Sequence, residues 1–135
     1  MRAERIRKTQ ENEKGQSLVE FALVVPLLLL LVVGIFEFGR AWMTKNIMTG
    51  AAREAARVAV VSGVNWKAYG EARGNDVLAN LPSSTCIMTD GTDAHGNPLK
   101  IATVTYVYNF LTIVNLLPGF PNSITLTSTT TMRTE

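Results

Sequence analysis

An apolar run near the N-terminal end of the sequence constrains the fold more than any other feature. Phe21 to Phe36 reads FALVVPLLLLLVVGIF without a charge, and the run reaches back to Leu18 with Glu20 as its only charged residue. A helix needs roughly 20 mostly apolar residues to cross a hydrocarbon core of about 30 Å. We therefore expect a membrane-spanning helix at 18–36, because the rest of a 135-residue chain is too short to bury such a helix in a soluble core.

A secretory signal peptide is the main alternative for this run. Such a signal has a shorter apolar region that a small-residue cleavage site follows, whereas EFGRAW at 37–42 follows here. Charge orients the span only weakly, since five Lys and Arg residues precede the run and four follow it within residues 40–57. Nucleic acid is not an expected partner, because no basic patch is interleaved with aromatic residues.

The junction KGQSLVEF, Lys14 to Phe21, places Glu20 at the mouth of the apolar run. A carboxylate inside a bilayer is costly, although a position near the end of a span lowers the cost. Glu20 is therefore either a tolerated residue at a helix end or a residue that needs a partner. Cleavage after Gly15 would make Glu20 the fifth residue of the new chain. It would also leave a free amine on Gln16, about 6 Å away along the helix.

From Gly15 to about Val61 the sequence resembles the TadE-like family, the minor pilins (pseudopilins) of the tight-adherence type IVb pilus. Three elements carry the resemblance in this order: the Gly-x4-Glu-Phe junction at 15–21, EFGR at 37–40 and AAREAAR at 51–57. Residues 1–15 also match the short, hydrophilic leader of prepilins of that class.

The resemblance implies a minor pilin that a prepilin peptidase cleaves between Gly15 and Gln16, with Glu20 and Phe21 acting in assembly. In a filament, the Glu20 carboxylate of one subunit would meet the Gln16 amine of a neighbour. Two charges that are each costly in an apolar core would then offset one another. The implied partners are other pilin and pseudopilin subunits, the prepilin peptidase, the inner-membrane pilus assembly platform and membrane lipid.

The implied location is the bacterial inner membrane, with a single pass, a cytoplasmic N-terminus and a periplasmic head. From there the subunit either remains in the membrane or enters the extracellular pilus. The alternative function is a permanently membrane-anchored periplasmic binding or scaffold module of a secretion machine. Gly15 and Glu20 distinguish the two functions, because only a processed pilin requires them.

The fold expected for the whole chain is α+β and, with the resemblance, type IV pilin-like. A long helix at 16–62 should span the membrane in its first half and kink at Pro26. The head, residues 63–135, should hold a shorter helix or helical turns at Trp66–Leu81 and a small antiparallel sheet. The expected strands are 84–90, 100–108 and 123–132. The apolar connection 109–122 lies over the sheet, touches the membrane or meets a partner.

Residues suited to catalysis or metal binding are few. His95 lies in the turn-forming DGTDAHGNP segment, and together with Asp90 and Asp93 it fits no EF-hand or zinc spacing. Cys86 is the single cysteine, so it is either a buried thiol or an intermolecular link. We expect no enzyme activity, no cofactor and no metal site.

Overall fold

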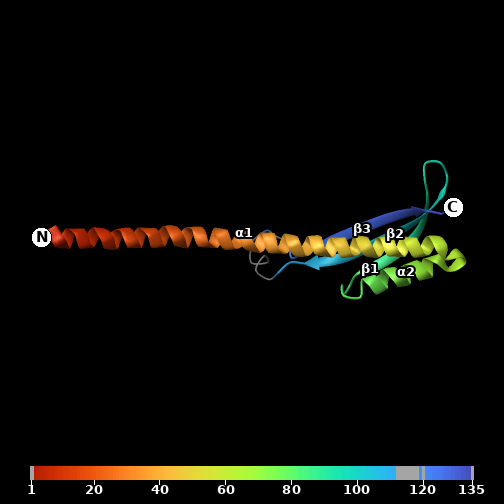
Figure 1. Ribbon diagram of the computed structural model, residues 1–135, viewed down its shortest axis with the longest axis horizontal. Helices are drawn as coiled ribbons and strands as arrows, with labels where there is room; N and C mark the ends of the chain where they lie inside the picture. The colour runs from red at the N-terminus through yellow and green to blue at the C-terminus, as the bar shows by residue number, and fades with distance from the viewer. Residues whose placement is uncertain (1, 112–118, 120, 135) are drawn as a thin grey trace. The chain divides into compact units, whose positions relative to one another are not determined.

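The computed structural model describes the backbone of residues 2–111, 119 and 121–134, and within these ranges the side chains from Gly15 onward. The elements are helix α1 (Arg2–Val61), the 3-10 turn η1 (Gly63–Asn65), helix α2 (Trp66–Val77) and strands β1 (Thr85–Thr92), β2 (Pro98–Asn109) and β3 (Ser123–Arg133) (Figure 1). The predicted α+β class is confirmed. The chain forms two compact units, Met1–Phe38 and Gly39–Glu135, which are described in turn.

In the first unit, residues 21–36 of α1 are apolar on every side. Its large apolar side chains are mostly exposed, for example Leu18 at 68%, Phe21 at 68% and Leu23 at 76%. A helix that is apolar all round is stable only inside a core or in lipid. By length and composition, α1 is able to cross a membrane, as predicted. The helix begins at Arg2 rather than near residue 16, because residues 2–14 contain no proline or glycine to stop it.

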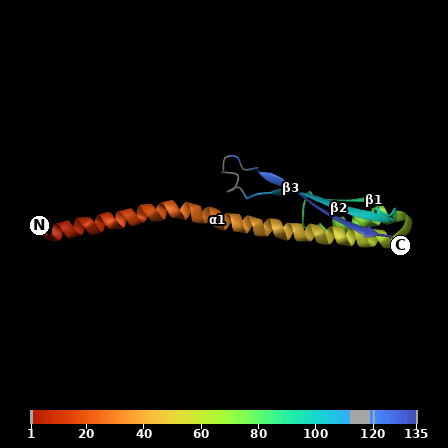
Figure 2. The same cartoon turned by 90° about the horizontal axis from the view of Figure 1, so that it is seen from above.

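Pro26 lies inside α1 without ending it. Proline lacks the amide donor of the helical ladder, and its ring crowds the carbonyl of the preceding turn. Figure 2 shows α1 bending in this part of its first half. The bend agrees with the kink that the sequence predicts.

In the second unit, one face of α1 packs against the sheet. The buried residues of this face are Met48, Ala51, Ala52, Ala55, Ala56 and Ala59, each at most 1% exposed. Alanine side chains let the helix backbone approach the sheet closely, so the AAREAAR motif has a packing role. The charged residues of the motif lie outside this face, where Arg57 bonds Glu54 at 2.9 Å. The helix ends at Val61, just before Gly63, whose φ of +58° favours glycine.

The sheet is an antiparallel meander in the order β1-β2-β3. Its register places Cys86 opposite Val104 and Val104 opposite Ser128, and all three side chains are buried. Figures 1 and 2 show the strands running along the second half of α1. The three predicted strands are confirmed, each within a few residues of its expected ends.

Helix α2 covers the outer edge of β1. Asn75 Oδ1 accepts the N–H of Cys86 at 3.1 Å, and Glu71 Oε1 accepts the N–H of Met88 at 3.1 Å. Unpaired amides at a sheet edge are able to pair with a strand of another chain. The side chains of Asn75 and Glu71 occupy two such amides of β1. The helix stops at Val77, short of the predicted Leu81. We attribute the early stop to Pro82, which disfavours helical backbone at the residue before it.

Two glycines let α2 lie close to β1. A Cβ at Gly74 would lie 2.4 Å from Cys86 Sγ and 2.9 Å from Cys86 Cβ, and a Cβ at Gly70 would lie 3.1 Å from Met88 Cγ. The sequence left Cys86 as either a buried thiol or an intermolecular link, and the structure shows the buried thiol. Burial, and secondarily the charge of Glu71, raise the pKa of this thiol.

The turn between β1 and β2 is built around Asp93. Its carboxylate accepts the backbone N–H groups of His95 and Asn97 and the side-chain amide of Asn97, each at 2.8 Å. The bonds from Asn97, and then that from His95, lower the pKa of Asp93. His95 itself is exposed. Residues 112–118 and 120 of the apolar connection lie outside the described residues.

Gly74→Ala should destabilise the head by about 1–3 kcal/mol, because the new methyl overlaps Cys86 and overpacking has this typical cost. Thermal unfolding of the full chain in detergent, followed by near-ultraviolet circular dichroism, measures the effect. The matched control is Gly50→Ala, since a Cβ there meets no atom within 4 Å. That change should be neutral or stabilise by about 0.5–1 kcal/mol. Equal melting temperatures for the two variants would contradict the close packing.

Asp93→Asn should lower the melting temperature at neutral pH and lose this effect in acid. A carboxyl whose folded pKa is lowered stabilises the fold above its unfolded pKa, and the stabilisation disappears as pH falls through the folded pKa. The difference between wild type and variant should therefore shrink below the ordinary Asp value of 3.8. Melting curves over an acid series test this, and a difference independent of pH would refute the role of the charge.

Candidate assembly site at the start of the apolar helix

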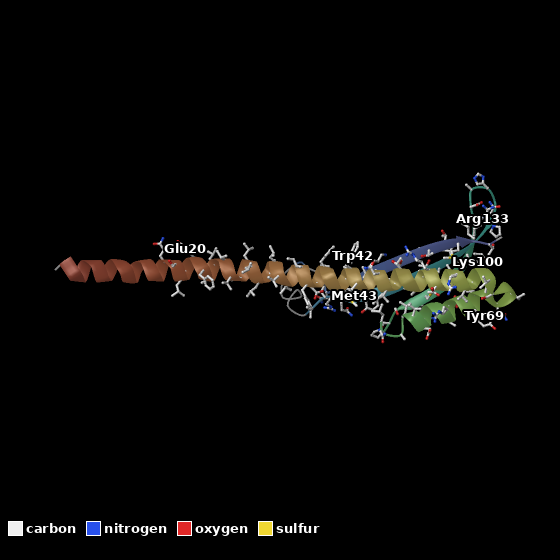
Figure 3. The ribbon with its side chains drawn as sticks, viewed as in Figure 1. Glu20, Trp42, Met43, Tyr69, Lys100 and Arg133 are labelled. Atoms are coloured by element: carbon white, nitrogen blue, oxygen red, sulfur yellow. The ribbon has the colours of Figure 1, made fainter. Side chains whose placement is uncertain are left out.

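The predicted site residues Gly15, Gln16, Glu20 and Phe21 all lie on α1. Residues four apart share a face of a helix, so Gln16 and Glu20 are neighbours on the surface. Gln16 Nε2 donates a hydrogen bond to Glu20 Oε1 at 3.3 Å. Figure 3 labels Glu20 on the first half of α1. Phe21, one residue further along, lies about 100° around the helix and is 68% exposed.

In the described part of the chain, no contact or backbone conformation requires glycine at position 15. A Cβ at this position would meet no heavy atom within 4 Å, and the backbone φ is not positive. In a helix interior, glycine is less favourable than alanine by about 0.8–1 kcal/mol. Neither packing nor backbone geometry explains the residue, so any demand for a small side chain comes from outside the described structure.

The Glu20 carboxylate lies among exposed apolar side chains. Val19 is 67% exposed, Phe21 68% and Leu23 76%. Among the described side chains, the partner that Glu20 has is the Gln16 amide, which carries no charge. A carboxylate in an apolar environment is costly unless a cation offsets its charge or a proton neutralises it. The site therefore offers a hydrogen-bond acceptor, suited to pairing with a cation, among apolar side chains.

The other candidate residues do not form a second site. Among the described side chains, those of residues 15–111, 119 and 121–134, no cluster of three or more His, Cys, Asp or Glu is placed to hold a metal ion. Asp90 pairs with Lys100 Nζ at 2.5 Å. The same ammonium lies 3.6 Å from the ring centre of Trp66. Asp93 is held within its turn.

Sequence reasoning did not single out Trp42 and Met43. Both are exposed, at 60% and 66%, on the first turns of the second unit. The signal that could have found them was a tryptophan shortly after an apolar span, which is the position that interfacial aromatic residues prefer. Sequence reasoning also missed the position of the nearby Arg40, whose guanidinium carbon lies 5.3 Å from the ring centre of Tyr108.

Comparison with known proteins gives one match. Residues 15–57 match the family model described as "TadE-like protein". The match covers about a third of the chain, starts at Gly15 and includes the 15–21, 37–40 and 51–57 motifs. No curated protein and no solved structure matches the chain.

Proposed function

We propose that this chain, whose residues 15–57 match the family model described as "TadE-like protein", is a minor pilin of the tight-adherence pilus. In this proposal a prepilin peptidase cleaves after Gly15, and α1 holds the subunit in the inner membrane with residues 1–15 in the cytoplasm. The head lies in the periplasm. The assembly platform then brings the subunit together with other pilins and pseudopilins. The chain acts as a structural subunit, without catalytic activity or a cofactor.

The observation that carries the proposal is the isolated charge of Glu20 on an apolar, exposed helix. The carboxylate has a neutral amide beside it at 3.3 Å, so no described side chain from Gly15 onward is shown to offset its charge. Cleavage after Gly15 creates a cation on Gln16, about 6 Å from Glu20 along the helix axis. If neighbouring subunits are staggered by this rise, the carboxylate of one helix meets the amine of the next, and both charges are offset.

Gly15 supports the same proposal by a separate route. A Cβ at Gly15 meets nothing inside the described structure, so its small size is available to an enzyme that must bind the backbone closely. The proposed prepilin peptidase is such an enzyme, because it must recognise a small residue at the cleavage site. An uncleaved, permanently anchored module has no use for it.

Gly15→Val should block processing and leave a subunit that is fifteen residues longer. The measurement is the intact mass of the protein isolated from membranes. Gly34→Val is the matched control, because Gly34 also lies on α1 and a Cβ there would meet no heavy atom within 4 Å, so this variant should be processed normally. A wild-type protein that keeps Met1 or Arg2 as its N-terminus in assembled pili would refute cleavage and favour the anchored module.

Glu20→Ala should give a subunit that is inserted and cleaved but does not assemble. Removal of a charge favours insertion. It also strands the neighbour's amine, and loss of one partner of a buried pair costs about 3–5 kcal/mol. Cross-linking in membranes and recovery of sheared pili measure assembly. Leu23→Ala, which removes an equally exposed apolar side chain, should assemble normally. Wild-type amounts of pili with Glu20→Ala would reduce Glu20 to a tolerated residue.

A further inference from the structure

The exposed apolar surface of α1 continues beyond the span that the sequence predicts. By sequence the span ends at Phe36, because a charged residue, Glu37, follows it. In the structure, Phe38, Trp42 and Met43 are also exposed, at 69%, 60% and 66%. After Met43, α1 exposes no large apolar side chain over residues 44–60, all of which are described, and then exposes Val61, its last residue, at 79%. The change from an apolar to a polar surface therefore falls after Met43.

The charged residues between 37 and 45 interrupt this surface less than their sequence positions suggest. Glu37 is only 5% exposed. Arg40 is exposed, but its guanidinium lies over the ring of Tyr108. The Lys45 ammonium donates to the carbonyl of Thr127. The two cations are thus directed toward β2 and β3, and the exposed Trp42 and Met43 lie beside them on the helix (Figure 3).

The apolar surface is longer than the hydrocarbon core of a bilayer. Residues 18–36 cover about 28 Å of helix, close to the core thickness of about 30 Å. The additional residues, 37–43, cover about 10 Å more. One headgroup layer is about 5–8 Å thick, since the two layers together bring the bilayer to about 40–45 Å, so residues 37–43 are long enough to cross one such layer.

We propose that residues 37–43 of α1 lie in the headgroup layer of the membrane, with Trp42 as the interfacial anchor. Tryptophan prefers this depth because its ring is apolar and its indole N–H is polar. Phospholipid is the occupant that fits this surface, since the surface is continuous with the apolar span. The water-exposed part of the helix then begins at Thr44. The proposal rests on the insertion of α1 in the membrane, which belongs to the proposed function, but on neither cleavage nor filament assembly.

The chain has two tryptophans, which makes the test direct. Trp66→Phe leaves Trp42 as the sole tryptophan, and Trp42→Phe leaves Trp66, which packs under Lys100. Each full-length variant is reconstituted in phosphatidylcholine vesicles whose acyl chains carry bromine either near the headgroup or near the bilayer centre. Trp42 fluorescence should be quenched strongly by shallow bromine and weakly by deep bromine, and little by aqueous iodide. Trp66 should be insensitive to both brominated lipids.

The controls separate this inference from the proposed function. Flotation of the vesicles reports insertion by itself, so failure to float refutes the membrane anchor, whatever the quenching. If the protein floats and iodide quenches Trp42 while bromine does not, residues 37–43 are in water and the inference is wrong. If neither agent quenches Trp42, another protein surface covers it, which equally overturns the lipid assignment. Melting curves of both variants establish that the head is folded in each measurement.

Discussion

The exposure of large apolar side chains along the first half of α1 is the constraint on which the rest of the structure depends. Removing one such side chain from water is worth about 1.5–3 kcal/mol, and the described side chains of residues 15–38 form no core in which to place them. This helix must contact lipid or other apolar helices. That environment is also what gives Glu20 its importance, since a charge that is harmless in water requires a partner there.

The head depends on a second constraint, the close approach of backbones. Alanines on α1 and glycines on α2 bring both helices against the strands that hold Cys86 and Met88. The match to TadE-like proteins includes the alanine-rich motif at 51–57. The matched segment therefore combines two physical tasks, an apolar helix for the membrane and a small-residue helix face that carries the head.

The candidate site was predictable because its residues are neighbours in sequence. Once 15–21 is helical, the shared face of Gln16 and Glu20 follows from 3.6 residues per turn. The extent of the apolar surface was not predictable in this way. It depends on where Arg40 and Lys45 point, and Tyr108 and Thr127, far along the chain, decide that.

By itself the sequence determined the apolar helix, the kink in that helix, the carboxylate at the start of its apolar run, and the strands. Hydrophobicity, periodicity and turn formers are properties of contiguous residues. Only the tertiary structure decided which face of α1 is buried, why Gly74 faces Cys86, and how Asn75 and Glu71 close the edge of β1. It also placed the end of the apolar surface at Met43 rather than Phe36. The physical reason is the same in each case: burial and charge pairing are set by residues that meet only when distant parts of the chain pack together.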